Sequence, residues 1–164
     1  MPRPTKKGLS YFPFDADFFK QAGPSILLYE IGCQGIILYI YLLCEIYTHE
    51  GYYLKLERLL KKYICSELGI IESDFDDIIK VCTDIEIFDK RLFEEKGILT
   101  SRYIQDVYQS AKQSMRRTVP VVVDRDLWLM DEKETLKFIV FSDEVELTPS
   151  LSIKESKLNE IKLN

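Results

Sequence analysis

Apolar residues recur at helical spacing through most of the chain. Residues 23–32, GPSILLYEIG, predict a short helix that ends at a glycine. Residues 33–48 are apolar on every side and carry Glu45 as their only charge, so they predict a helix at the centre of the fold. Residues 52–54, YYL, then predict one short strand.

The next two segments each predict an amphipathic helix. Residues 55–68 place five apolar residues inward and four basic residues outward; these are Leu56, Leu59, Leu60, Tyr63 and Ile64, and Lys55, Arg58, Lys61 and Lys62. Residues 73–85 carry an apolar stripe at spacing i, i+3, i+4, i+7 and i+10, with Ser73 as the predicted N-cap. Three aspartates fill the first turn of this helix, where the macrodipole favours anions by about 0.3–1 kcal/mol each.

The segment after this helix predicts a β-wing with a structured tip. The triplets EIF and ILT, residues 86–88 and 98–100, are candidate strands. Residues 89–97 between them predict a helical turn that Asp89 caps and Gly97 ends.

Ser101 then caps a last helix, RYIQDVYQSAKQSMRR. From the central helix onward the predicted order is helix, strand, helix, helix, strand, strand, which is the order of a winged helix. We therefore predict a mainly α fold with a small β-sheet, in which residues 21–117 form a winged-helix (winged helix-turn-helix) domain with extra N- and C-terminal helices. Outside this domain we expect an arm over residues 1–20, a short β-leaning extension over 118–147 and a flexible tail over 148–164. The β-leaning runs lie near 121–123 and 138–141.

The arm is rich in aromatic residues that must be buried somewhere. Tyr11, Phe12 and Phe14 lie around Pro13. They can cover one side of the protein's own core, or they can reach onto a second protomer, and the sequence leaves both readings open.

Composition and charge narrow the class of protein. The chain is 46% hydrophobic, which favours a folded domain, and its net charge of −5 argues against a surface covered with phosphate-binding residues. The longest uncharged run, residues 31–44, is shorter than the about 20 residues that a membrane span needs. No secretory signal is visible, and the cysteines fit buried reduced thiols. We expect a cytoplasmic protein without disulfides or membrane contact.

The sequence offers no constellation for catalysis or for a cofactor. His49 is the only histidine, and no cysteine or serine lies at motif spacing from it. Glycine-rich phosphate loops and metal-spaced His/Cys clusters are missing from the sequence. The acidic run 72–77 lacks the glycine and the distal glutamate of a calcium loop. We expect a protein that is not an enzyme, with no cofactor and no metal.

The helix over residues 73–85 would enter the DNA groove in a winged helix, but its outer face is acidic. Its outer positions carry a net charge of −2, from Asp74, Asp77, Lys80 and Asp84. Duplex DNA presents one phosphate charge per about 1.7 Å, so groove reading by this helix is disfavoured. Residues 67–96 hold ten acids and four bases, which suits a basic partner or head-to-tail assembly. The predicted protein-interaction residues are Asp74, Asp77 and Asp84, with Tyr11, Phe12 and Phe14 of the arm.

A different surface has the charge for weak, non-specific DNA binding. The candidate nucleic-acid-binding residues come from the arm, the amphipathic segment 55–68 and the last helix: Arg3, Lys6, Lys7, Lys55, Arg58, Lys61, Lys62, Arg102, Lys112, Arg116 and Arg117. If they fold onto one side, they form a sequence-neutral phosphate track. Otherwise they are ordinary solvated faces whose stems cover apolar surface.

Three stretches, RPTKKGLSYFPFDADFF, GIILYIYLLCEIYTHEGYYLK and IFDKRLFEEKGILTSRYIQ, resemble the N-terminal domain of a group of phage and prophage proteins related to DnaD-like replisome organisers. The resemblance covers residues 3–117. It implies a winged-helix fold and a role in assembling replication machinery on DNA for a mobile element, and it implies no catalytic residues. In DnaD-like proteins this domain is associated largely with self-association. Longer relatives carry a second helical domain, whereas only 47 residues follow Arg117 here.

These lines together predict a phage or mobile-element replication accessory that resembles a replisome organiser, acting through protein assembly with weak non-specific DNA binding. Expected partners are replication proteins such as a helicase-loading factor, further copies of the chain in a homo-oligomer, and DNA on the basic side. Two alternatives stay open. A DNA-binding transcriptional regulator predicts a neutral or basic face on the 73–85 helix, and a pure protein-interaction adaptor predicts no salt-dependent DNA binding.

Overall fold

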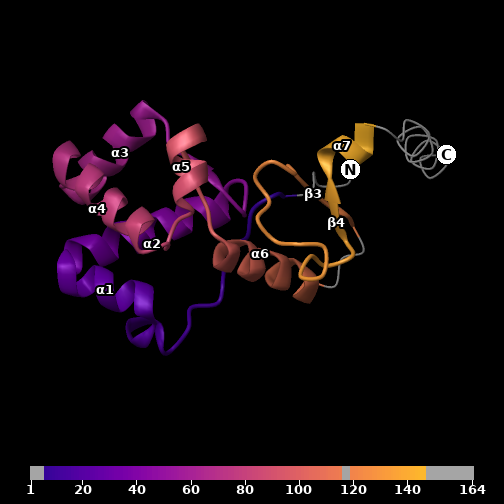
Figure 1. The fold of residues 1–164 in the computed structure, drawn as a ribbon, viewed down its shortest axis with the longest axis horizontal. Coiled ribbons are helices and arrows are strands. Elements are labelled where there is room, and N and C mark those ends of the chain that lie inside the picture. The colour runs from indigo at the N-terminus through magenta and orange to yellow at the C-terminus, as the bar shows by residue number, and fades with distance from the viewer. Residues whose placement is uncertain (1–5, 116–118, 147–164) are drawn as a thin grey trace. The chain divides into compact units, whose positions relative to one another are not determined.

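The structure, a computed structural model, describes residues 6–115 and 119–146. The chain divides into two compact units, one ending at Arg116 and the other beginning at Arg117, and each is described by itself. The first unit is mainly helical with a small antiparallel sheet, and the second contains a small parallel sheet (Figure 1). The predicted tail over residues 148–164 lies outside the described residues.

The helices of the first unit follow one another with short connections. They are the 3-10 helix η1 (Phe18–Lys20) and the α-helices α1 (Ala22–Glu30), α2 (Cys33–Thr48), α3 (Arg58–Leu68), α4 (Glu72–Asp84), α5 (Lys90–Lys96) and α6 (Arg102–Ser114). Its strands, β1 (Leu54–Lys55) and β2 (Ile98–Leu99), pair antiparallel, with Leu54 opposite Leu99.

Helix α2 is the central element of the first unit, as its uniformly apolar sequence predicts. Leu38, Leu42 and Ile46 are fully buried, and Tyr39 and Tyr47 are nearly so. Figure 1 shows α2 running through the middle of this unit. A helix without a charged face is stable in water only when its neighbours cover most of it, which explains this position.

Three predicted helix caps are confirmed. Asp89 begins α5, and its carboxylate accepts a hydrogen bond of 2.8 Å from the backbone N–H of Leu92. Gly97 ends α5 in the left-handed conformation, with φ of 65°. The Ser101 hydroxyl accepts from the N–H of Ile104 at 3.2 Å and so begins α6.

The predicted N-cap of α4 is wrong. The helix begins at Glu72, Ile71 holds the N-cap position, and no side chain there accepts a hydrogen bond from the first turn. Ser73 therefore lies inside the first turn instead of before it. The carboxylates of Glu72 and Asp74 stabilise this helix start through the macrodipole.

The strand predicted over residues 86–88 is also absent, because this segment closes α4. Glu86 has a positive φ of 61°, and the N–H groups of Ile87 and Phe88 both donate to the carbonyl of Cys82. Ile87 and Phe88 are buried at 8% and 0% exposure. Their apolar side chains are therefore part of the hydrophobic core, and neither residue pairs with a strand. Within residues 6–115 the wing is reduced to the β1–β2 pair, so the structure does not confirm a winged helix.

The predicted inward face of α3 is wrong at two positions. Leu59 is 80% exposed and Tyr63 is 57% exposed, while Ile64 and Cys65 are buried. The apolar residues of this segment span a wider arc than one packed face can cover. Packing against α4 selects the Ile64 side and leaves Leu59 and Tyr63 in solvent.

The second unit confirms both β-leaning runs as strands. β3 (Val121–Val123) and β4 (Ile139–Phe141) pair in parallel, and α7 (Ser142–Glu146) follows directly. Trp128 is buried at 7% exposure, and its ring N–H donates to the Thr135 hydroxyl at 2.9 Å. Arg125 lies over the ring of Phe141, with 4.0 Å between the guanidinium carbon and the ring centroid.

Candidate functional site

Acidic side chains occupy the outer face of α4. Asp77 and Asp84 are exposed, and Asp74 is half-buried. Asp74 lies in the first turn, where backbone N–H groups have no helical partner and favour an anion. Asp77 and Asp84 lie beyond that turn, so the start of the helix does not account for their charge.

Lys61 of α3 is held by the acids of α4. Its Nζ lies 2.6 Å from Asp76 Oδ1 and 3.9 Å from Glu72 Oε2, and its side chain is only 20% exposed. The ammonium also lies 5.8 Å from the centroid of the Phe75 ring. Lys61 was predicted to contact phosphates, but here it is paired with two exposed carboxylates of the protein itself.

A second ion-pair cluster joins the end of α4 to α5. Lys90 Nζ lies 3.0 Å from Asp84 Oδ1, and Lys80 Nζ lies 4.0 Å from Asp84 Oδ2. The hydrogen bond from Lys90 lowers the pKa of Asp84 and raises the pKa of Lys90. Because these side chains are at least 44% exposed, the cluster orients the two helices without adding much stability.

A groove of about 300 Å³ opens between α4, α5 and the segment before α3. Its volume is at the lower limit of ordinary ligand pockets. Ile79 is buried, Leu56 and Phe93 are half-buried, and together they form an apolar floor with Thr83 beside them. The rim carries three carboxylates and two ammonium groups, from Asp76, Asp84, Glu94, Lys80 and Lys90. We call this site the α4–α5 groove.

The other basic residues of the α3 segment differ in their surroundings. Lys55 Nζ donates to the backbone carbonyl of Lys96 at 2.7 Å, which ties β1 to the end of α5. Arg58 and Lys62 are exposed on α3. Of the four basic residues of the segment, Lys61 is therefore the one that the α4 carboxylates bind.

The remaining predicted basic residues belong to the arm and to α6. Lys112 Nζ donates to the backbone carbonyl of Lys6 at 2.7 Å, and Lys7 pairs with Glu50 at 3.4 Å. Arg102 is exposed at the start of α6. Figure 1 shows α6 apart from α3, so the structure brings Lys6 and Lys112 together but does not place them beside α3. Arg3, Arg116 and Arg117 lie outside the described residues.

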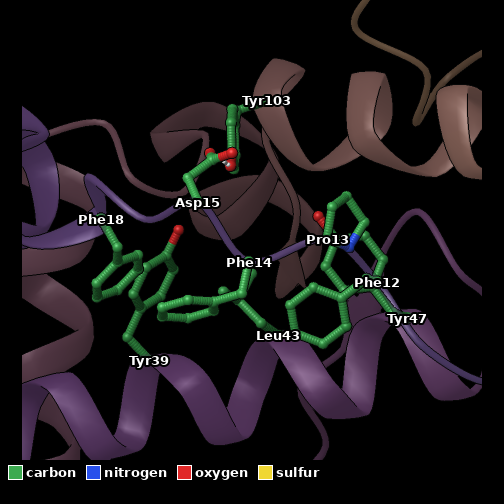
Figure 2. A pocket seen from close by; sticks show the side chains of 9 residues that line it. All are labelled: Phe12, Pro13, Phe14, Asp15, Phe18, Tyr39, Leu43, Tyr47 and Tyr103. Carbon is green, nitrogen blue, oxygen red and sulfur yellow. Dashed lines mark hydrogen bonds between the residues drawn. The ribbon is translucent and has the colours of Figure 1, made fainter.

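The arm packs its aromatic residues along α2. The ring centroids of Phe12 and Tyr47 are 4.5 Å apart, and those of Phe14 and Phe18 are 4.6 Å apart. Figure 2 shows these rings lying over α2 beside Tyr39. The hollow that they enclose measures about 10 Å³, which is hardly room for one water molecule. We call this contact the aromatic seam; it supports the reading in which the arm covers the protein's own core.

Polar contacts hold the arm in the aromatic seam. The Tyr103 hydroxyl of α6 donates to Asp15 at 2.5 Å, and the Gln21 amide donates to the same carboxylate at 3.1 Å (Figure 2 shows the first pair). These bonds, the one from Tyr103 foremost, lower the pKa of Asp15. Burial and the bond to Asp15 raise the pKa of Tyr103 to about 12.

Not every arm side chain is covered by the seam. Tyr11 is 73% exposed and Phe14 is 50% exposed, so both still present apolar surface to solvent. Of the three predicted arm contacts, Phe12 is the one that is committed to the protein's own core.

Sequence reasoning missed the floor of the α4–α5 groove. Leu56, Ile79 and Phe93 come from three segments, and each looks like an ordinary core residue in its own helix pattern. The available signal was the predicted helical turn over residues 89–97, placed directly after an acidic helix. Glu94 of that turn was not singled out either.

Metal ligands, cysteines and membrane spans complete the description of residues 6–115 and 119–146. Residues 6–115 and 119–146 contain no group of three histidine, cysteine or acidic side chains arranged to hold a metal ion. All four cysteines are free thiols. Cys65 and Cys82 are buried as expected, but Cys33 and Cys44 are exposed, which corrects the expectation of buried thiols. Across the same residues, no helix combines the length and the apolar character needed to cross a bilayer.

Comparison with known proteins gives a family and one clear relative. The profile of the family described as Lin1244/Lin1753-like, N-terminal, matches residues 11–104. A protein of Listeria innocua, named Uncharacterized phage-related protein Lin1244/Lin1753, is 31% identical over 183 aligned residues. The alignment covers 99% of this chain and 58% of the relative, so the chain spans less than two thirds of that protein's length. No solved structure matches the chain.

Proposed function

We propose that this chain, which belongs to the Lin1244/Lin1753-like family of phage-related proteins, is a docking module in the replication of a phage or mobile element. It works through protein assembly and binds DNA weakly and without sequence preference. Its partners are replication proteins with a basic surface, such as a helicase-loading factor, and further copies of the chain. The phage-related name of the relative and the resemblance to replisome organisers support a role in the replication of a phage or mobile element.

One observation carries the docking role: the net charge of the chain is concentrated around α4 and α5. Residues 72–96 hold nine acids and four bases, a net charge of −5 that equals the net charge of all 164 residues. The remainder of the chain therefore carries equal numbers of acids and bases. Such a concentrated field attracts basic partners and repels the phosphates of a duplex.

The contacts of the basic residues support only weak DNA binding. Lys61 is neutralised by Asp76, and Lys7 is paired with Glu50. Arg58 and Lys62 remain exposed on α3. A few phosphate contacts of this kind give affinity that falls with salt and does not depend on base sequence.

Exposed apolar side chains support self-association. Leu59 and Tyr63 on α3 are 80% and 57% exposed, and Ile37 on α2 is 53% exposed. Between residues 21 and 44 the chain carries a single charge, that of Glu30. A contiguous apolar patch built from such side chains would mark a protein contact.

Fluorescence anisotropy of single- and double-stranded oligonucleotides, combined with light scattering, tests this function. We expect micromolar DNA binding that weakens steeply with salt, and an oligomer that Leu59→Glu or Tyr63→Glu dissociates. Tight binding to one particular DNA sequence would favour a transcriptional regulator. If the chain forms an oligomer but binds no DNA even at low salt, the DNA-binding part of the proposal is wrong. The chain is then a pure protein-interaction adaptor.

A further inference from the structure

We propose that the α4–α5 groove binds a short basic peptide segment of a partner protein, which inserts one bulky apolar side chain between Leu56, Ile79 and Phe93. The inference rests on the proposed docking function, because it names the partner chemistry and the exact surface. Nothing in the family match or in the relative's name assigns this groove.

The shape of the groove fits an inserted side chain. The chain fills the aromatic seam down to about 10 Å³, whereas about 300 Å³ stays open over the apolar floor between α4 and α5. An open apolar floor loses the dispersion contacts that a partner's side chain would restore. The space is far larger than a single ion or water requires, and it lies between two helices, as grooves that receive peptide anchors do.

The charges of the rim select a cationic segment. Asp76 is bound by Lys61, and Asp84 is bound by Lys90, so two of the three rim carboxylates already have a partner. The Glu94 side chain accepts no hydrogen bond and forms no ion pair within 4.0 Å among the described residues, although its charge helps to raise the pKa of the nearby Lys90. Its carboxylate, in the field of the surrounding net charge of −5 over residues 72–96, is the acceptor for an arginine or lysine next to the anchor.

The same charges disfavour an anionic ligand. The rim lysines, Lys80 and Lys90, both lie within 4.0 Å of Asp84, so this carboxylate already balances part of their charge. A nucleic acid entering the groove would also meet the acids of α4 at close range. The basic peptide is thus the ligand that satisfies both the floor and the rim.

A fluorescein-labelled octapeptide serves as the probe. It has a central leucine–phenylalanine pair, one glycine on each side of the pair, and two arginines at each end. We expect saturable binding to the full chain at about 50 mM salt and binding weaker by about tenfold at 300 mM, because the attraction is screened. Replacing the central pair by glycines should weaken binding by about tenfold or more, since the anchor then has no apolar surface to bury.

Two matched variants distinguish binding in the α4–α5 groove from non-specific attraction by the negative charge of residues 72–96. Glu94→Lys and Glu95→Lys change the net charge equally at neighbouring positions of α5, but Glu95 lies outside the groove lining and pairs with Arg91 at 3.4 Å. We expect Glu94→Lys to weaken peptide binding by about fivefold or more and Glu95→Lys by less than about twofold. Both side chains are exposed, so circular dichroism should show unchanged helix content.

The outcomes distinguish the groove from the docking role itself. Equal weakening by the two variants, or equal binding of the glycine-substituted peptide, overturns the groove and leaves the acidic surface as a general attractor of basic partners. No binding of any arginine peptide at low salt overturns the groove together with the docking role. Phe93→Ala, checked for folding by its melting temperature, should weaken binding of the leucine–phenylalanine peptide. It should not change binding of the peptide whose central pair is replaced by glycines.

Discussion

The first unit has two apolar hollows that its own chain treats in opposite ways. In the aromatic seam, Phe12 and Phe14 lie over α2 and leave about 10 Å³. In the α4–α5 groove, about 300 Å³ stays open over Leu56, Ile79 and Phe93. The arm is the richer of the two regions in aromatic residues, and the sequence left open whether it covers the protein's own core or reaches a second protomer. The difference shows that a segment rich in aromatic residues can be closed by its own packing, while apolar space beside a charged rim stays open.

The polar groups of the two regions differ in the same way. In the seam, Asp15 accepts from Tyr103 and from Gln21, so its carboxylate fastens the arm to the rest of the unit. On the groove rim, Glu94 has no such partner among the described residues. The carboxylate of the seam is held by two hydrogen bonds from the protein, whereas the Glu94 carboxylate on the groove rim accepts none.

The largest expected effect comes from opening the seam. Phe18 is 6% exposed and its ring contacts those of Phe14 and Tyr39, so Phe18→Ala removes a buried aromatic ring and leaves a cavity. We expect a loss of about 3–5 kcal/mol in the free energy of unfolding, measured by urea denaturation. The neighbouring Phe19 is 55% exposed, and Phe19→Ala should cost less than about 1 kcal/mol. Equal losses for the two variants would contradict the packing of the seam.

A smaller effect is expected where the arm enters the seam. A Cβ on Gly8 would lie 2.0 Å from the backbone oxygen of Thr48, and the adjacent Leu9 N–H donates to the Tyr47 carbonyl at 2.6 Å. Gly8→Ala should therefore push the arm off α2 and cost on the order of 1–3 kcal/mol. Limited proteolysis should cut the arm faster, whereas Ser10→Ala, at an exposed position, should not change the rate. Binding of the octapeptide to the α4–α5 groove should remain unaffected by both.

The sequence predicts well what local chemistry decides. Asp89, Gly97 and Ser101 were predicted as helix caps and act as such, because a cap depends on a few neighbouring backbone groups. The central helix was predicted from its uniform apolar character. The phage-related character of the family was also predicted, from stretches that lie largely within the matched residues 11–104. The relation to DnaD-like replisome organisers stays a prediction.

The sequence fails where packing between segments decides. Ile87 and Phe88 favour a strand by composition, but the core takes them up as the closing turn of α4. The same holds for Leu59, whose exposure depends on which side of α3 meets α4. The groove depends on three segments at once, so no single pattern along the chain could have predicted it.

The hydrogen bond between Tyr103 and Asp15 gives the seam a dependence on pH. The folded-state pKa of Asp15 lies below its ordinary value, so the stabilisation is present above about pH 4 and is lost as the pH falls through the folded-state pKa. Tyr103→Phe removes the main cause of this shift, and the pKa of Asp15 should rise toward its ordinary value, which a carboxyl NMR titration measures. The variant should melt below the parent protein near neutral pH, and the difference should shrink near pH 2. A constant difference at both pH values would contradict the role of the carboxylate.

The smallest expected effect concerns two neighbouring lysines of α3 and the weak DNA binding of the proposed function. Lys61 is bound by Asp76, whereas Lys62 is exposed. Lys61→Ala and Lys62→Ala change the net charge equally, so any difference between them reports direct phosphate contact. Lys62→Ala should reduce the slope of log affinity against log salt by about 1, and Lys61→Ala should leave it nearly unchanged. Equal slopes for both variants would mean that the ion pair between Lys61 and Asp76 breaks when DNA binds. Lys61 would then contact phosphate directly, and the DNA-binding residues would extend to the edge of the acidic surface.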